Sequence, residues 1–226
     1  MNETAHAKDL TVAVLGGTGA EGSGLAYRWA AAGLDVIVGS RELARAQAGA
    51  DELNALLGKA GVRAMCNEDA ARAATIVVLT VPHAAQQATI LPLKQHLQNK
   101  VLVDVTVPLV PPRVDRVALP GGRSAVTLLQ EALGDQVKVV AAFQNISAHH
   151  LKDPQHEIEC DVLVCGDDEA AREQVVALAR HAGLRGLHAG VLANAVATEA
   201  LTSVLIAINK RYKVRGSGIR ITGIAD

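Results

Sequence analysis

The chain contains very few aromatic residues: one Trp, two Tyr and one Phe among 226 residues. Proteins that bind single-stranded nucleic acid stack bases on aromatic side chains, so this scarcity argues against such a role. The formal net charge of −1 argues against a general nucleic-acid binder, because phosphate backbones attract clustered positive charge. We therefore expect a small-molecule partner and no nucleic acid.

Cysteine is also scarce. There are three, Cys66, Cys160 and Cys165, an odd number that cannot all pair within one chain, and their spacing fits no zinc pattern. His149, His150 and His156 cluster in the sequence, but their spacing does not place metal ligands on one face. We expect buried thiols in a reducing cytosol and no metal site.

Long uninterrupted apolar segments are missing. Residues 1–9 are polar and carry no apolar signal segment. The longest apolar run near the C-terminus is interrupted by polar side chains, namely Asn194, Thr198, Glu199 and Thr202. The sequence therefore predicts a cytoplasmic protein with no membrane partner.

What the chain does have is a regular alternation of strands and helices. Residues 11–15, 36–38, 76–81, 101–105 and 137–143 are short apolar runs typical of buried strands, and residues 62–64 form a weaker one. Helical spacing of apolar residues separates them at 22–33, 42–57, 68–73 and in part of 83–97. This alternation predicts the α/β class, with a Rossmann-like doubly wound parallel sheet. Residues 108–122 hold four of the seven prolines, which predicts an irregular loop near the ligand.

The pattern changes after about residue 150. A strand at 161–166, a helix at 168–182 and a long amphipathic helix at 192–208 follow. We therefore predict a dinucleotide-binding domain over residues 1–150 and a small C-terminal α/β domain over residues 151–226 that completes the substrate cleft. The last helix either packs within its own chain or forms the interface of a homodimer.

A glycine motif follows the first strand directly and opens a helix. Gly17, Gly19 and Gly22 form the pattern Gly-x-Gly-x-x-Gly. Such glycines permit a tight turn, close approach of a diphosphate to the backbone, and close packing of helix against strand. A dinucleotide site is therefore predicted here. A carboxylate is unusual beside a phosphate, so we expect Glu21 to point outward.

The end of the second strand distinguishes between the two nicotinamide dinucleotides. An NAD site usually has Asp or Glu there to bind the ribose hydroxyls, whereas this chain has Gly39-Ser40-Arg41. A hydroxyl and a guanidinium suit a ribose phosphate, and Arg45 lies one helical turn beyond Arg41. These residues predict a binding site for NADP(H), although Arg41 and Arg45 also fit the solvated start of a helix.

Two further strand ends are expected to lie beside the ligand. Thr80-Val81-Pro82-His83 ends one strand, and Asp104-Val105-Thr106-Val107-Pro108 ends the next. In open α/β sheets, ligands bind outside the carboxyl ends of the strands. These turns should line the nicotinamide side, where His83 is either a ligand contact or a surface residue.

Five segments together carry a resemblance to a known family: Gly16-Gly17-Thr18-Gly19, Gly39-Ser40-Arg41, Asn67-Glu68-Asp69-Ala70-Ala71, Leu79-Thr80-Val81-Pro82 and Val164-Cys165-Gly166-Asp167-Asp168. From about residue 11 to 221 the chain resembles the NADPH:coenzyme F420 oxidoreductases. The resemblance implies direct hydride transfer between the nicotinamide C4 and the deazaflavin C5.

The resemblance also assigns residues to roles. It implies that Thr18, Gly19, Ala20 and Glu21 lie at the diphosphate and that Ser40, Arg41 and Arg45 lie at the ribose phosphate. It places Val81 and Pro82 near the cofactor, and Ile146 and Ala148 beside the nicotinamide. Family members often carry a histidine where this chain has Gln144. Gln144 and Ile146 are therefore predicted to position the nicotinamide, with no acid or base assigned.

Two alternatives remain open. One is an NADPH-dependent reductase of another acceptor, such as a flavin, a ferric chelate or a small carbonyl compound, and Gln144 favours it. The other is a non-catalytic NADP(H) sensor. A basic C-terminal segment, either a solvated tail or a guide for the anionic tail of F420, consists of Lys210, Arg211, Lys213, Arg215 and Arg220.

Overall fold

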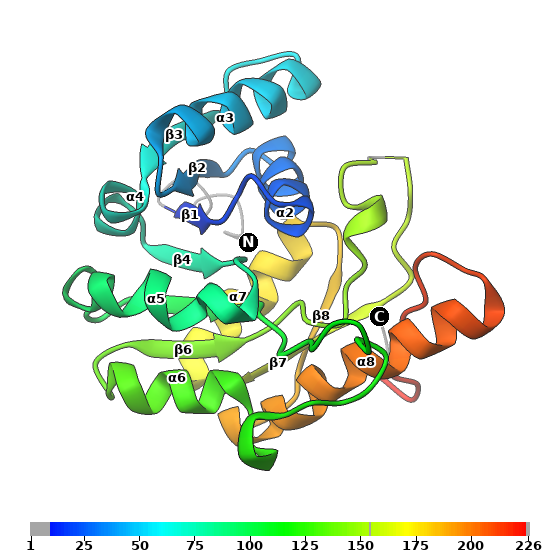
Figure 1. Cartoon of the computed structure of the whole chain (residues 1–226). Coiled ribbons are helices and arrows are strands. Elements are labelled where there is room, and N and C mark those ends of the chain that lie inside the picture. The colour runs from blue at the N-terminus through cyan, green and yellow to red at the C-terminus, as the bar shows by residue number, and fades with distance from the viewer. Residues whose placement is uncertain (1–9, 154, 225–226) are drawn as a thin grey trace.

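The computed structural model describes residues 10–153 and 155–224 and contains one eight-stranded sheet with the order β3-β2-β1-β4-β5-β6-β7-β8 (Figure 1). Neighbouring strands pair in parallel except β6 and β7, which are antiparallel. The strands are β1 (Thr11–Leu15), β2 (Asp35–Ser40), β3 (Val62–Cys66), β4 (Ile76–Leu79), β5 (Val101–Asp104), β6 (Lys138–Ala141), β7 (Asp161–Gly166) and β8 (Arg185–His188).

Helices cover both faces of this sheet. The α-helices are α2 (Ala20–Ala31), α3 (Leu43–Leu57), α4 (Asn67–Ala73), α5 (Gln86–Ile90), α6 (Ala125–Leu133), α7 (Glu169–His181) and α8 (Ala195–Tyr212). Short 3-10 turns are η2 (His83–Ala85), η3 (Leu91–His96), η4 (Pro120–Gly122), η5 (Ala148–His150) and η6 (Leu192–Asn194). The predicted fold class is confirmed.

The two faces of the sheet belong to two separate apolar clusters. Val12 and Val14 of β1 pack with α2, α3 and α7, whereas Ala13 and Leu15 pack with α4, α5 and α6. This division follows from the alternation of side chains along a strand. Because both faces are buried, the central strands are mostly apolar on both sides, as in Val12–Leu15 of β1 and throughout β4, which is the pattern that the sequence showed.

The residues after 150 extend the same sheet rather than starting another one, because β7 pairs with β6 and β8 pairs with β7. Trp29 of α2 joins the two parts of the chain: its indole donates to the Leu178 carbonyl at 2.9 Å and its ring meets Phe143 edge-on. The division into domains at residue 150 stays a prediction. The polar segment 1–9 lies outside the described residues.

Some elements differ from those predicted. The sequence did not predict α6 or β8, and the helix expected within residues 83–97 is divided into η2, α5 and η3. Residues 105–119 are irregular, as expected of the proline-rich loop. The three cysteines are unpaired; Cys160 and Cys165 are buried, and Cys66 is half-buried.

One described helical stretch, Leu192–Tyr212, is long and apolar enough to cross a membrane by length and composition alone. Its buried residues are mixed, however, because the polar Thr198, Glu199 and Ser203 are buried beside Ala195 and Leu205. The Glu199 carboxylate accepts hydrogen bonds from the Ser124 hydroxyl at 2.5 Å and from the Ala125 and Val126 N–H groups at 2.9 and 3.1 Å. Glu199 therefore fixes α8 to the start of α6.

Candidate functional site

A cavity lies where the carboxyl ends of β1, β2 and β4 meet. Residues from four separate segments line it: Gly16, Thr18, Ser40, Arg41, Glu42, Arg45, Asn67, Val81, Pro82, Ala85 and Thr89. The order β2-β1-β4 brings these strand ends side by side, at the point where the order of strands reverses. The structure thus brings together the glycine turn, the Ser40-Arg41 segment and the Val81-Pro82 turn.

The glycine turn is closed by its own backbone. The Gly17 N–H donates to the Val14 carbonyl at 3.2 Å and the Gly19 N–H to the Gly16 carbonyl at 2.9 Å. A Cβ on Gly22 would lie 2.3 Å from the Thr80 hydroxyl oxygen, and one on Gly17 would lie 2.9 Å from the Val14 carbonyl oxygen. Only glycine fits at these positions, so α2 begins directly against the strand ends.

The first turn of α2 offers backbone donors at this place. Its N-cap is Gly19, which has no side chain to accept from the N–H groups of the first turn. The first N–H groups of a helix have no partner within the helix, and the positive end of its dipole favours an anion. The N–H groups of Ala20 and Glu21 therefore fit a diphosphate, which is the group that this glycine pattern predicts.

The end of β2 places positive charge on the same cavity. Arg41 is exposed and has no ion-pair partner among the described residues, whereas Arg45 pairs with Glu42 at 3.0 Å on the exposed start of α3. The described lining of this cavity holds two arginines and one carboxylate, and Glu42 already binds Arg45. Arg41 and the neighbouring Ser40 fit a phosphate on the adenosine ribose.

The residues predicted beside the nicotinamide are divided between two places. Val81 and Pro82 line the cavity, whereas Ile146 is buried and Ala148 half-buried in the loop after β6. Gln144 is buried, and its amide donates to the main-chain oxygen of Asp104 at 2.8 Å. The Gln144 side chain therefore binds the main chain at the end of β5 and does not face open solvent.

A buried polar group that the sequence did not assign lies under this region. The Asp104 carboxylate accepts from the Gln86 amide at 2.5 Å and from the Thr106 N–H at 2.8 Å. Burial raises the pKa of Asp104 to about 7, although the hydrogen bonds from Thr106 and Gln86 lower it. The only signal in the sequence was an acid at the end of an apolar run.

The expected orientation of Glu21 is wrong. Its Oε1 atom has no solvent-accessible surface and no hydrogen-bond partner among the described residues. Burial raises the pKa of this carboxyl to about 8. The residue as a whole is half-buried, so one of its carboxylate oxygens lies inward, and this was not visible from a glycine motif.

Arg28 is a structural residue that sequence reasoning missed. Its guanidinium donates to the carbonyls of Leu151 at 2.8 Å, Ala182 at 3.1 Å and His150 at 3.2 Å, and also to those of Asp153 and His156. One side chain of α2 thus holds the loop that contains Ile146 and Ala148.

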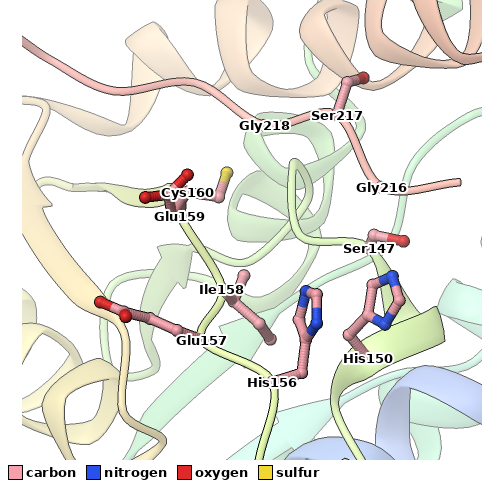
Figure 2. A pocket seen from close by; sticks show the side chains of 10 residues that line it. All are labelled: Ser147, His150, His156, Glu157, Ile158, Glu159, Cys160, Gly216, Ser217 and Gly218. Atoms are coloured by element: carbon pink, nitrogen blue, oxygen red, sulfur yellow. The ribbon is translucent and has the colours of Figure 1, made fainter. Parts of the chain in front are cut away.

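A second cavity of about 390 Å³ opens beside that loop (Figure 2). Ser147, His150 and residues 156–160 form one wall, and Gly216, Ser217 and Gly218 form the opposite one. The rings of His150 and His156 stack with centroids 3.8 Å apart. The Ser147 hydroxyl donates to the Arg215 carbonyl at 3.1 Å, so the chain after α8 runs next to the Ile146 loop.

The basic C-terminal segment is partly neutralised. Lys210 pairs with Asp115 at 2.8 Å, and Arg220 lies 3.8 Å from Asp161. The side chains of Arg211, Lys213 and Arg215 are exposed and have no charged partner within the part of the chain that the structure describes. Positive charge therefore remains at the end of the second cavity.

This chain is similar to known proteins along almost its whole length. Residues 11–108 match the family model described as NADP oxidoreductase, coenzyme F420-dependent. The F420-dependent NADP reductase of Methanocaldococcus jannaschii is 37% identical over 223 residues, which cover 95% of this chain and 99% of that protein. The F420-dependent NADP reductase of Methanothermobacter thermautotrophicus is 38% identical and covers 96% of this chain and 97% of that protein.

The chain belongs to the family of coenzyme F420-dependent NADP oxidoreductases. A crystal structure from Arthrobacter sp. FB24 shares its fold, with a TM-score of 0.79 and 24% identity over 94% of this chain and 99% of that one. Membership of the F420-dependent family and the Rossmann-like fold are thus confirmed. The roles of individual residues, including Gln144, stay predictions.

Proposed function

We propose that this protein transfers a hydride between NADP(H) and coenzyme F420. The observation that carries the proposal is 37–38% identity to F420-dependent NADP reductases along almost the whole chain. NADP(H) supplies the hydride chemistry when it is bound. The chain's own task is to hold two rings at a short distance, which needs no general acid, base or metal.

In this proposal each group of the first cavity binds one part of the dinucleotide. The N–H groups of Ala20 and Glu21 bind the diphosphate, while Ser40 and Arg41 bind the ribose phosphate, with Arg45 nearby. Val81 and Pro82 contact the cofactor at the end of β4. Ile146 and Ala148 contact the nicotinamide, and Gln144 positions that region through the Asp104 carbonyl.

The ribose phosphate site is tested by Arg41→Asp. The substitution removes a charged donor and adds repulsion, so NADP⁺ binding should weaken by about 2–4 kcal/mol while NAD⁺ binding changes little. Calorimetric Kd values for both dinucleotides measure this difference. Arg180→Asp, which changes an exposed arginine of α7, is the matched control. An equal loss of affinity for both dinucleotides in Arg41→Asp would contradict the assignment.

The acceptor is tested separately. Gln144 is uncharged where the family often has a histidine, and this favours a second candidate function, reduction of another acceptor by NADPH. Stopped-flow oxidation of NADPH should be fast with F420 and slow with free flavin, ferric chelates and small carbonyl compounds. Fast oxidation by one of those compounds and none by F420 would favour the second candidate.

We further propose that the anionic tail of F420 lies along the second cavity. The exposed Lys213 and Arg215 lie where the chain leaves α8, and Arg215 is held against Ser147 by its main chain. Ser147 neighbours Ile146, so an acceptor stacked there would have its tail directed toward these charges.

We also propose a cytoplasmic homodimer in which the outer face of α8 is covered by a second copy of the chain. Val204 and Ile208 share this face, because they are four residues apart, and both are exposed. Two exposed apolar side chains on one face of a helix suit a contact with a second copy. The buried polar residues of the same helix favour a protein partner over lipid.

A further inference from the structure

The proposed site for the ribose phosphate contains a negative charge that phosphate binding does not need. Glu42 lines the first cavity together with Ser40, Arg41 and Arg45. A phosphate monoester carries a charge of about −1.5 to −2 at neutral pH, so a carboxylate beside it is unfavourable. The described lining of the cavity carries two positive charges and one negative charge. Glu42 therefore leaves the site with less positive charge than the phosphate can use.

The start of α3 explains why Glu42 binds Arg45. Glu42 is the N-cap of this helix, and its side chain makes no capping hydrogen bond. Its main-chain N–H donates to the Ser40 hydroxyl oxygen at 3.4 Å, which ties the end of β2 to the start of the helix. Residues three apart lie on the same side of a helix. The Glu42 carboxylate accordingly accepts a hydrogen bond from Nε of Arg45 at 3.0 Å.

Other carboxylates on the neighbouring helices have cations of their own. Glu68 and Asp69 of α4 both pair with Arg72, at 2.8 and 3.0 Å. Glu52 lies further along α3 and pairs with Lys152 at 2.8 Å. These pairs take no cation from the described lining of the first cavity. The pair at the start of α3 differs from them, because both of its members line that cavity.

We propose that Glu42 limits the affinity for NADP(H) by competing with the ribose phosphate for Arg45. The inference rests on the proposed function, which places that phosphate at Ser40 and Arg41. The side chains of Arg45 and Glu42 are 68% and 66% exposed, and exposed ion pairs are weak. A phosphate accepts strong charge-assisted hydrogen bonds from a guanidinium. Binding of NADP(H) therefore turns Arg45 from Glu42 to the phosphate, and each binding event must break the ion pair.

The competition affects only one of the two nicotinamide dinucleotides. NAD(H) lacks the ribose phosphate, so it has no group that takes Arg45 away from Glu42. Both dinucleotides carry the diphosphate, which binds at the first turn of α2 in the proposed function, so its contribution cancels when their affinities are compared. Glu42 is thus a specificity-determining residue: it reduces the preference for NADP(H) over NAD(H) that Arg41 creates.

The test is the calorimetric Kd of Glu42→Gln for NADP⁺ and for NAD⁺ at physiological ionic strength. The amide keeps the length of the side chain and removes its charge, and no capping hydrogen bond is lost. The variant should bind NADP⁺ about fivefold more tightly than the unmodified protein does, which is the effect of releasing a cation from an exposed ion pair. Its Kd for NAD⁺ should change by less than about twofold. Asp51→Asn removes an exposed acid of α3 outside the described lining of the cavity, and this control should change neither Kd.

A double-mutant cycle with Arg45→Gln separates competition from simple repulsion between Glu42 and the phosphate. Salt screens direct repulsion between exposed charges, so the gain from Glu42→Gln should disappear once Arg45 is replaced. No gain in NADP⁺ affinity, an equal gain for both dinucleotides, or a gain that persists with Arg45→Gln would overturn the inference. Equal affinity of the unmodified protein for NADP⁺ and NAD⁺ would overturn the ribose phosphate site and the inference together. These outcomes concern dinucleotide binding alone, so they are distinct from a failure of hydride transfer to F420, which would contradict the proposed function.

Discussion

Asp104 shows how a single residue can link the carboxyl end of an inner strand to the proposed site. It ends β5, is fully buried and accepts hydrogen bonds from Gln86 and Thr106, while its carbonyl accepts from Gln144. Three segments therefore meet at one residue. Because burial raises the pKa of its carboxyl to about 7, Asp104 binds a proton more tightly in the folded than in the unfolded chain.

The stability of the protein should consequently depend on this proton. Between the unfolded pKa of about 4 and the folded pKa of about 7, the unfolded chain releases the proton first, so the free energy of unfolding falls as the pH rises. Asp104→Asn should remove this fall in the free energy of unfolding, because an amide does not titrate in this pH range. At pH 8 the variant should be more stable than the unmodified protein by about 2 kcal/mol, and near pH 5 the difference should be smaller.

Urea denaturation between pH 5 and pH 8 measures the difference. Asp135→Asn, which changes an exposed acid, is the control and should follow the unmodified protein at every pH. If Asp104→Asn is less stable by the same amount throughout this range, the carboxylate is ionised in the folded protein and the expectation is wrong.

At the scale of single residues, the sequence predicted where glycine is required better than it predicted which way a side chain points. Gly17 and Gly22 were predicted from the pattern alone, because a close approach of backbone needs glycine and leaves that signature. Glu21 was placed wrongly, and the role of Arg28 was missed. Burial and contacts with carbonyls more than a hundred residues away depend on tertiary packing, which a local pattern does not record.

At the scale of the elements, the contribution of the positively charged C-terminal segment after α8 to F420 binding can be tested. Replacing Lys213 and Arg215 with Gln should raise the KM for F420 several-fold at low salt, because two exposed positive charges beside the second cavity are lost. The KM for NADPH should not change. The effect should shrink at high ionic strength, since salt screens exposed charges.

The control for this segment is Lys59→Gln, because Lys59 is an exposed lysine just past the end of α3. Steady-state kinetics at two salt concentrations provide the measurement. A KM for F420 that is the same in the double variant and the unmodified protein at low salt would show that the segment is only a solvated tail.

The elements that sequence reasoning found and missed differ in a physical way. Strands that consist of a run of apolar residues are easily seen in the sequence, as in β4. The sequence analysis missed α6, although Ser124 caps it and Val126, Leu129 and Leu133 form its buried side. The strand β8 reads Arg-Gly-Leu-His and lies at the edge of the sheet, where few apolar side chains are required.

At the scale of the whole molecule, the prediction of α/β architecture was correct because strand–helix alternation restricts the possible topologies. The antiparallel β7 was not foreseen, since the direction of a strand in the sheet is set by the path of the chain rather than by its side chains. The last helix was equally compatible with burial and with an interface. The structure shows a helix that buries the polar residues Thr198, Glu199 and Ser203 and leaves the apolar Val204 and Ile208 exposed.

That exposed side of α8 is where the proposed homodimer can be tested. Val204 and Ile208 are 46% and 37% exposed, while Leu43 and Leu56 of α3 are exposed to 56% and 54% and provide a matched control. Val204→Asp with Ile208→Asp should convert the dimer to a monomer in light scattering, because each copy would bury two carboxylates in an isologous interface. Leu43→Asp with Leu56→Asp should remain dimeric. An unmodified protein that is monomeric, or that sediments with lipid vesicles, would show that α8 does not cover a second copy.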